Sequence, residues 1–217
     1  MSKLYTFDLD GVIVDTAKYH FLGWSFIAEK LGADLTLSDN EQLKGLSRMD
    51  SIEKLLEIKG ISISEDEKIR LANLKNDYYV ELIQGLSPKD ILPGAIDLIR
   101  LLQEKGISIA LGSSSKNARF ILGKLEIEGY FDIIIDGNDV FKAKPDPEVF
   151  LLSAQRLGID PRECVVLEDS ASGIEAACIG GMKSIGVGSS SILAKANIVV
   201  ASLEELDFEK LSSNGLL

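Results

Sequence analysis

The sequence is poor in cysteine, in basic charge and in long apolar runs, and each shortage excludes a class of protein. Its two cysteines, Cys164 and Cys178, suggest no disulfide framework, so we interpret them as free thiols in a reducing compartment. Lys and Arg number 23 against 34 Asp and Glu, for a net charge of -11. A general nucleic-acid binder would present a basic face, so nucleic acid is not expected as a partner.

No apolar stretch of the sequence is long enough to cross a bilayer. The first residues also lack the apolar run of a signal peptide, because Asp8, Asp10 and Asp15 occupy that region. We therefore expect a cytoplasmic protein with no membrane partner, and nothing in the sequence demands more than a monomer. The composition is that of an ordinary globular protein, with 46% hydrophobic and 26% charged residues in 217.

Several short β-branched or aromatic runs are typical of buried strands, and helical patterns separate most of them. The expected strands are residues 4–7, 107–111, 133–135, 165–167, 184–187 and 198–200. The helical patterns between them cover residues 95–105, 118–125, 147–157 and 173–179. Gly106 and Gly158 stand where two of these helices should end. The alternation predicts an α/β fold, a Rossmann-like doubly wound parallel sheet.

The interval between the first two strands differs because it holds helical patterns and no convincing strand. The expected helices in it are residues 17–31, 39–43, 48–59 and 65–84. We predict an α-helical cap domain, residues 16–87, inserted into a catalytic core of residues 1–15 and 88–217. Gly85 and Pro88 mark the second crossing between the two. Residues 212–217 are expected to fray.

Two carboxylates follow the first strand. Side chains two apart on an extended chain point to the same side, so Asp8 and Asp10 should project together while Leu9 turns away. They would repel each other unless a cation lay between them, and hard oxygen ligands suit Mg²⁺. The alternative is a pair of solvated turn aspartates.

Three more polar groups follow later strands, at the edge where open α/β sheets bind ligands. Ser113 and Ser114 precede a helix whose N-terminal amides, with these hydroxyls, are suited to phosphoryl oxygens; the alternative is a serine-rich helix cap. Lys144, beside a proline, is suited to neutralise an aspartate and a phosphate; the alternative is an exposed lysine. Glu168 and Asp169 would complete a metal site; the alternative is a helix cap, with Asp169 or Ser170 before the next helix.

Together these elements resemble the haloacid dehalogenase superfamily of phosphotransferases, over nearly the whole chain from Asp8 to Asp169. The resemblance implies that Asp8 is the nucleophile and Asp10 the general acid/base. It implies that Ser113 and Lys144 bind the transferring phosphate. It also implies Mg²⁺ as cofactor, held by Asp8, Asp169, the Asp10 carbonyl and Glu168.

A mutase of this superfamily needs a second, distal phosphate site, whereas a hydrolase does not. Arg48 is suited to bidentate phosphate binding, and Lys44 with the Gly45 backbone to sugar hydroxyls. On the core, the polar residues just beyond Ser113 are the further candidates: Ser115, Lys116 and Asn117. The alternative for Lys44 and Arg48 is solvated charge at a helix boundary.

His20, the one histidine, lies four residues after Thr16, so the two share a helix face close in sequence to Asp10. From that face a hydrogen bond would support Asp10 as the cap closes, and Lys75 would line the same cleft. The alternative for His20 is a satisfied, partly buried histidine.

The cap and loop residues resemble the β-phosphoglucomutase family within this superfamily, although Ser114 stands where that family often has alanine. The resemblance implies a phosphomutase acting on a small sugar phosphate. The reaction would interconvert β-D-glucose 1-phosphate and glucose 6-phosphate through an aspartyl-phosphate enzyme and β-glucose 1,6-bisphosphate. Two alternatives stay open: a Mg-dependent sugar-phosphate or phosphoglycolate phosphatase, and an idle ligand-binding relative, against which the complete set of acidic and basic groups speaks.

Overall fold

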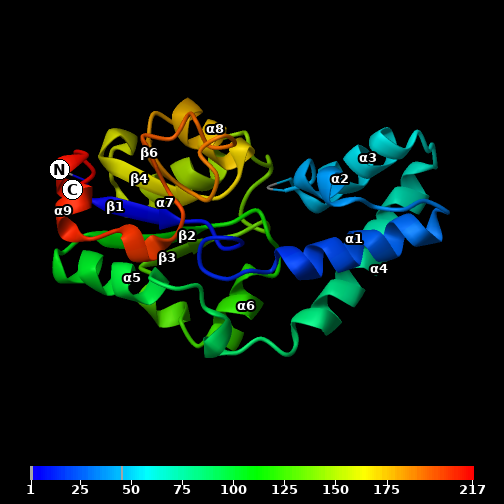
Figure 1. Cartoon of the computed structure of the whole chain (residues 1–217), viewed down its shortest axis with the longest axis horizontal. Coiled ribbons are helices and arrows are strands. Elements are labelled where there is room, and N and C mark those ends of the chain that lie inside the picture. The colour runs from blue at the N-terminus through cyan, green and yellow to red at the C-terminus, as the bar shows by residue number, and fades with distance from the viewer. Residues whose placement is uncertain (1, 45) are drawn as a thin grey trace. The chain divides into compact units, whose positions relative to one another are not determined.

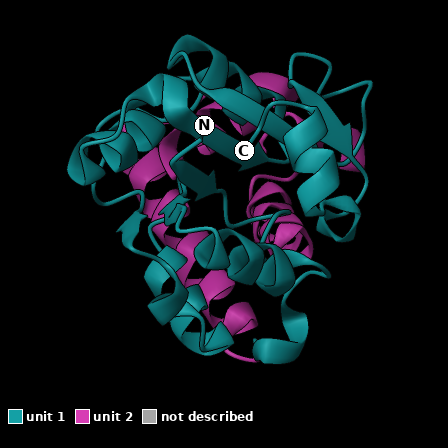
Figure 2. Cartoon of the chain, turned by 90° about the vertical axis from the view of Figure 1, so that its left-hand side faces the viewer, with its two compact units in different colours: residues 1–15, 86–217 teal, residues 16–85 magenta. Residues whose placement is uncertain are grey.

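A computed structural model describes residues 2–44 and 46–217, and it consists of two compact units (Figure 1). The core unit comprises Met1–Asp15 and Leu86–Leu217, and the helical unit comprises Thr16–Gly85 (Figure 2). The second boundary between them thus follows Gly85, two residues before the position expected from the sequence. Both crossings lie outside the strands, so the insertion interrupts no hydrogen-bonded ladder of the sheet.

The core unit is built on a six-stranded, entirely parallel sheet in the order β3-β2-β1-β4-β5-β6. The strands are β1 Leu4–Phe7, β2 Ser108–Gly112, β3 Ile133–Ile135, β4 Cys164–Glu168, β5 Lys183–Val187 and β6 Ile198–Val200. Each expected strand is present, with ends that move by one residue at most. Phe7 of β1 pairs with Leu111 of β2 and Leu167 of β4, so the residues that follow these three share one edge of the sheet.

Helices cover both faces of this sheet, as a doubly wound α/β fold requires. The core unit's α-helices are α5 Ala95–Glu104, α6 Ala118–Leu125, α7 Glu148–Leu157, α8 Ala171–Ile179 and α9 Phe208–Ser213. α7 and α8 pack on one face against a buried cluster that includes Leu4, Ala110 and Val166, and Figure 1 shows α5 and α6 on the opposite side. The left-handed Gly158 ends α7, as expected.

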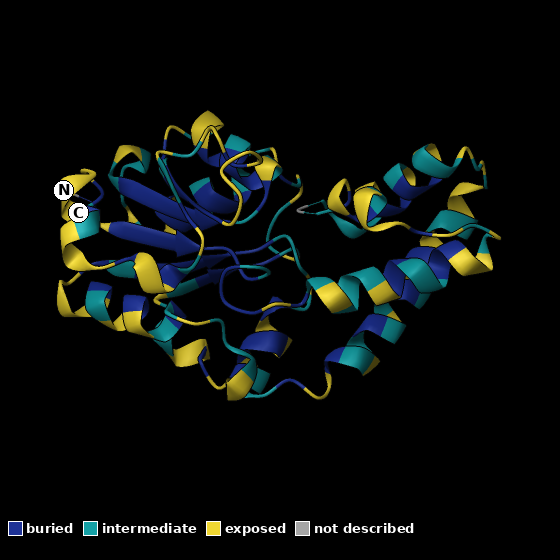
Figure 3. Cartoon of the chain, in the orientation of Figure 1, coloured by how far each residue is buried: buried dark blue, intermediate teal, exposed yellow. Residues whose placement is uncertain are grey.

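The helical unit has a separate apolar core. Its helices are α1 Ala17–Lys30, α2 Leu37–Glu41, α3 Arg48–Lys59 and α4 Glu65–Ile83. Trp24 and Ile27 of α1 pack with Leu55 of α3 and Leu71 of α4. Figure 3 shows buried residues alternating with intermediate and exposed ones along α1 and α4. Among the described residues, no helix combines the length and the apolar character of a membrane span.

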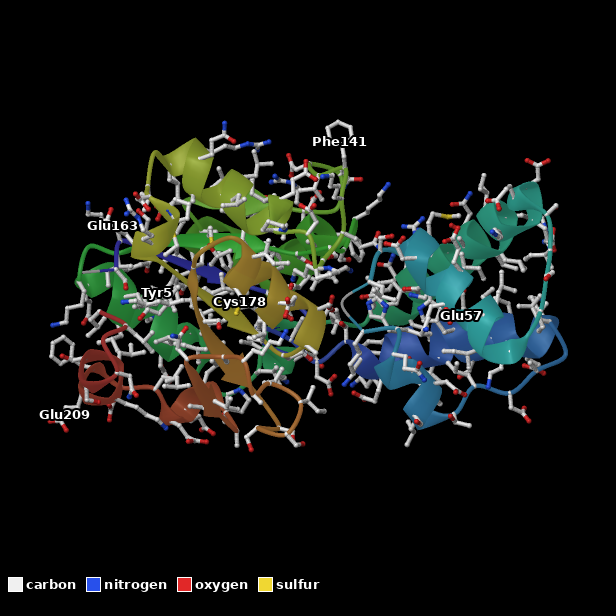
Figure 4. The ribbon with its side chains drawn as sticks, turned by 90° about the horizontal axis from the view of Figure 1, so that it is seen from above. Tyr5, Glu57, Phe141, Glu163, Cys178 and Glu209 are labelled. Atoms are coloured by element: carbon white, nitrogen blue, oxygen red, sulfur yellow. The ribbon has the colours of Figure 1, made fainter. Side chains whose placement is uncertain are left out.

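The expectation of a frayed C-terminus is wrong. Leu216 is fully buried, and the Tyr5 hydroxyl of β1 donates a hydrogen bond to its carbonyl oxygen at 2.8 Å. The Lys183 ammonium donates to the neighbouring carbonyl of Gly215. These contacts fix the last residues to β1 and β5; Tyr5 is labelled in Figure 4.

Candidate active site

Asp8 is the first residue after β1, in the centre of the sheet. Its backbone amide donates to the Leu167 carbonyl at 2.9 Å, so the chain leaves the strand still anchored to β4. The residue as a whole is only 6% exposed. A carboxylate this deeply buried requires a partner, because its desolvation would otherwise favour the protonated acid.

Lys144 provides that partner from the loop before α7. Its Nζ donates to Asp8 Oδ1 at 2.7 Å and to Glu168 Oε2 at 2.8 Å. Burial alone would lower the pKa of this ammonium, but the two carboxylates more than offset that effect and raise the pKa above its ordinary value. Lys144 is 2% exposed, so the exposed-lysine alternative is excluded.

The pKa of Asp8 is raised to about 6. Burial makes the largest contribution and the Glu168 carboxylate adds to it, whereas the Lys144 ammonium opposes the increase. Two buried carboxylates therefore share one ammonium. Such a cluster gains from further positive charge, whether from a cation or from the approach of more basic groups.

Glu168 is held from its other side by the start of α8. Its Oε1 accepts from the Ser170 amide at 3.0 Å and from the Ser170 hydroxyl at 2.7 Å. Ser170, rather than Asp169, caps α8, with its Oγ accepting from the Gly173 amide at 3.1 Å. A Cβ on Gly173 would lie 2.0 Å from Glu168 Cδ, so only glycine leaves room for this carboxylate.

Asp8, Glu168 and Asp169 each offer a carboxylate oxygen, and these oxygens lie within 4.8 Å of one another. Gly11 permits the approach of Asp169: its φ is 77°, and a Cβ there would lie 2.2 Å from Asp169 Oδ2. All three donors are hard anionic oxygens, as divalent cations of the Mg²⁺ type prefer. The residues present therefore fit a metal site.

Asp10 lies in the turn between Asp8 and Gly11, and its backbone forms a bridge with Val14. It is half-buried. Its roles as general acid/base and as a carbonyl ligand stay predictions.

Residues 113–117 form a turn after β2 in which hydroxyls accept from backbone amides. Ser113 Oγ accepts from the Ser115 amide at 3.1 Å, and Ser115 Oγ accepts from the Asn117 amide at 3.2 Å. Ser113 is buried and its own amide donates to the Ile135 carbonyl of β3 at 3.0 Å. The residue before α6 is Asn117, which makes no side-chain cap, so the serines do not form the helix cap offered as the alternative.

The neighbouring strand end braces this turn. The Asn138 side-chain amide donates to the Lys116 carbonyl at 3.2 Å, and the Gly137 amide donates to the Ser115 carbonyl at 3.2 Å. The half-buried Ser114 belongs to the same turn. Phosphate binding by these residues stays a prediction, but their backbone is firmly placed.

In the helical unit, Arg48 begins α3 and is half-buried against α4. Its Nη2 donates to Asn76 Oδ1 at 2.7 Å, and its Nη1 reaches Asn73 Oδ1 at 3.5 Å. Lys44 forms a 2.9 Å ion pair with Glu41, the kind of surface contact that the alternative interpretation describes. Gly45, the third member of this predicted group, lies outside the described residues.

His20 and Lys75 meet inside the helical unit. Lys75 Nζ lies 3.0 Å from His20 Nδ1. It also lies 4.4 Å from the centroid of the Tyr79 ring, which makes a cation–π contact. An ammonium only donates, so His20 Nδ1 accepts and the ring is neutral with its proton on Nε2. Burial first, and then the charge of Lys75, lower the pKa of His20 well below its ordinary value. The backbone amide of His20 donates to the Thr16 carbonyl at 3.0 Å, which confirms their spacing of one helical turn.

Sequence reasoning missed the support that Ser170 and Gly173 give to Glu168, and the aromatic rings of Trp24 and Tyr79 around Lys75. The sequence offered Ser170 as a cap of the next helix, and it is the cap, but its hydrogen bonds to Glu168 were not expected. No local signal pairs Lys75 with His20, because 55 residues separate them.

Known proteins resemble this chain over most of its length. The sequence is 42% identical over 211 residues to the β-phosphoglucomutase of Bacillus subtilis, covering 96% of this chain and 93% of that protein. It is 33% identical to a phosphorylated carbohydrates phosphatase of Thermotoga maritima, covering 82% of each. The crystal structure of a β-phosphoglucomutase from Clostridium difficile superposes with a TM-score of 0.95 at 44% identity, covering 99% of this chain and 97% of that one.

The family description that matches the sequence is haloacid dehalogenase-like hydrolase, and the match runs over residues 2–178. It therefore includes the strand ends that carry Asp8, Lys144 and Glu168, as well as the whole helical insertion. With a family match over most of its length and a full-length relative at 42% identity, the chain belongs to the haloacid dehalogenase-like hydrolase family.

Proposed function

We propose that this protein is a β-phosphoglucomutase, which interconverts β-D-glucose 1-phosphate and glucose 6-phosphate. The full-length identity of 42% to a β-phosphoglucomutase supports the reaction. The structural observation that carries it is the buried Asp8 carboxylate bound to Lys144 at 2.7 Å, since a nucleophilic carboxylate needs a fixed cation to meet an anionic phosphate. The small-molecule partner in this proposal is a sugar phosphate, and we expect a monomer that acts in the cytoplasm.

In the first half-reaction, phosphorylated Asp8 donates its phosphoryl group to the free hydroxyl of the sugar phosphate. The bond between phosphorus and the Asp8 oxygen breaks as the bond to the sugar oxygen forms, and Asp10 takes the hydroxyl proton. The products are the free Asp8 carboxylate and β-glucose 1,6-bisphosphate. Lys144 stays beside Asp8 throughout, and Ser113 and Ser114 bind the transferring phosphoryl oxygens.

The bisphosphate then turns around and presents its other phosphate to Asp8. The carboxylate attacks that phosphorus, the sugar oxygen leaves with the proton held by Asp10, and the aspartyl-phosphate is restored. No water enters either half-reaction, so the phosphoryl group is conserved.

Mg²⁺ is the proposed cofactor, held by the side chains of Asp8, Glu168 and Asp169 and by the Asp10 carbonyl. When bound, it supplies positive charge that offsets the negative charge of the transferring phosphoryl group. The cluster of hard carboxylate oxygens within 4.8 Å supports the assignment.

The distal phosphate of the substrate needs its own cationic site. We assign Arg48 to it, with Lys44 and Gly45 at the sugar hydroxyls and Ser115, Lys116 and Asn117 contributing from the core unit. In this assignment the helical unit serves as the cap, and Thr16, His20 and Lys75 support Asp10 as the cap closes. The half-buried guanidinium of Arg48, already hydrogen-bonded on one edge, supports its place in the set.

A phosphatase is the second candidate, because a phosphorylated carbohydrates phosphatase is 33% identical to this chain. Phosphorus NMR of the protein with Mg²⁺, β-glucose 1-phosphate and a trace of β-glucose 1,6-bisphosphate separates the two. We expect glucose 6-phosphate to accumulate. Free phosphate without glucose 6-phosphate would refute the mutase and favour the phosphatase.

The roles of the two aspartates are tested by Asp8→Asn and Asp10→Asn. Both variants should lose mutase turnover while circular dichroism shows an intact fold. An active variant at either position would remove that residue from the chemistry and would also exclude the reaction as written.

A further inference from the structure

The guanidinium of Arg48 is held by a neutral partner. Its Nη2 donates to the Asn76 side-chain oxygen at 2.7 Å, across the 28 residues that separate the start of α3 from the middle of α4. The second asparagine of α4, Asn73, is exposed and only reaches Nη1 at 3.5 Å, the limit of a hydrogen bond. One strong contact therefore sets the orientation of the Arg48 fork.

The neutrality of Asn76 matters for what the guanidinium can bind. A guanidinium carries five N–H donors in a fixed plane, and an amide oxygen occupies one of them without cancelling the charge. A carboxylate in the same place would orient the fork equally well but would neutralise it. Arg48 is half-buried, and burial lowers the pKa of its guanidinium while Asp77 partly offsets that effect. The Asn76 oxygen thus orients the guanidinium without adding a negative charge of its own.

We propose that Asn76 is a positioning residue that pre-orients Arg48 to bind a phosphate group in two-point fashion, and that an uncharged acceptor is required there. This role rests on the proposed function, in which Arg48 binds the distal phosphate of the sugar. Because the orientation is set before the ligand arrives, less side-chain freedom is lost on binding.

The test compares four variants, Asn76→Ala, Asn76→Asp, Asn73→Ala and Arg48→Ala. Two reactions are measured for each. The first is mutase turnover with β-glucose 1-phosphate and a fixed amount of β-glucose 1,6-bisphosphate, and the second is phosphorylation of Asp8 by acetyl phosphate, which has no distal phosphate. Thermal unfolding checks that each variant folds.

Asn76→Ala should raise the KM for β-glucose 1-phosphate roughly tenfold, the effect of losing one charge-assisted hydrogen bond, and leave Asp8 phosphorylation within about twofold. Asn73→Ala makes the same change on the same helix and should behave as wild type. Asn76→Asp should raise the KM further than Asn76→Ala, because the carboxylate holds Arg48 and cancels its charge.

Three other results would each contradict a specific part of the proposal. If Asn76→Ala keeps the wild-type KM while Arg48→Ala raises it, Asn76 does not position Arg48, although the distal site stands. If Asn76→Asp equals wild type, the contact is merely structural and the requirement for neutrality is wrong. If Arg48→Ala itself leaves the KM unchanged, the distal-site assignment of the proposed function fails first.

Discussion

The space beside Gly173 allows a sharp test of how the acidic cluster is held. In the substitution Gly173→Ala, the new Cβ would lie 2.0 Å from both Cδ and Oε2 of Glu168. The carboxylate must therefore move. It cannot move freely, because Lys144 holds Oε2 at 2.8 Å and Ser170 holds Oε1 at 2.7 Å.

Two opposing effects set the change in stability. Replacing a helical glycine by alanine stabilises a helix by up to about 1 kcal/mol. Losing one charged hydrogen bond of Glu168 costs about 1.5–3 kcal/mol. The second effect is larger, so the free energy of unfolding should fall by about 0.5–2 kcal/mol, a loss that still leaves the protein folded.

The functional effect should exceed the effect on stability. Displacement of Glu168 would disturb both the proposed metal site and the Lys144 ammonium. Groups that orient metal ligands typically contribute about 10–100-fold to metal affinity or activity. We expect mutase turnover to need at least tenfold more Mg²⁺ for half-maximal activity. A titration of activity against Mg²⁺, with urea unfolding alongside, measures both quantities.

Gly123→Ala is the matched control. Gly123 also lies in a helix, α6, but nothing approaches the position of its Cβ within 4 Å. This variant should gain up to about 1 kcal/mol of stability and keep its Mg²⁺ dependence. If Gly173→Ala shows the same behaviour as Gly123→Ala, Glu168 is not confined in the way the structure indicates, and the reasoning is refuted.

Three further predictions concern other parts of the molecule. Lys144→Met leaves Asp8 without its hydrogen-bonded cation, so phosphorylation of Asp8 by acetyl phosphate should slow by about 10²–10³-fold; a rate within tenfold of wild type would contradict the role. The pKa of His20 is lowered in the folded protein, so below about pH 6.5 the unfolded chain binds a proton that the folded one does not. The free energy of unfolding should therefore decrease as the pH is lowered, by at most about 1.4 kcal/mol per pH unit. Urea unfolding between pH 7.5 and 5.5 should show that His20→Gln loses this slope, and equal slopes in both proteins would exclude His20 as its source. Tyr5→Phe removes the bond to the Leu216 carbonyl and should cost about 1–3 kcal/mol of stability with mutase activity unchanged; an unaltered denaturation midpoint would show that the C-terminal contact is not stabilising.

Much of the core could be predicted because its signals are local. Each strand is a short apolar run, and parallel strands bring their carboxyl ends to one edge. That rule alone predicts that Asp8, Lys144 and Glu168 lie near one another, and the 2.7 and 2.8 Å contacts of Lys144 agree with it. The ends of elements do not follow from the apolar pattern alone: α2 was expected over residues 39–43 but spans Leu37–Glu41. Thr36 moves the start, since it forms a capping box with Asp39 that the apolar pattern does not reveal.

The parts that could not be predicted depend on contacts distant in the sequence. Lys75 was expected to line a cleft, and nothing in the sequence indicated its aromatic surroundings: it is 4% exposed and packs against Trp24 and Tyr79. The fraying predicted for residues 212–217 failed for the same reason, because Tyr5 lies 211 residues away from Leu216. Helical periodicity shows which face of α4 is buried, but it does not show which residue of another helix a charged side chain on that face contacts.

The position of the insertion explains how one core can serve relatives with different named activities. The helical unit enters after Asp15 and leaves at Leu86, beyond the pairing of β1 with β2 and β4, so it can change without altering the register that holds Asp8. A β-phosphoglucomutase and a phosphorylated carbohydrates phosphatase both resemble this chain over most of its length. In the proposed mechanism, the groups at the edge of the sheet carry out the transfer from Asp8. Whether the phosphoryl group goes to water or to a hydroxyl of the sugar phosphate depends on what binds the rest of the substrate. The difference between mutase and phosphatase should therefore be sought in the helical unit, beginning with Arg48 and the uncharged side chain that orients it.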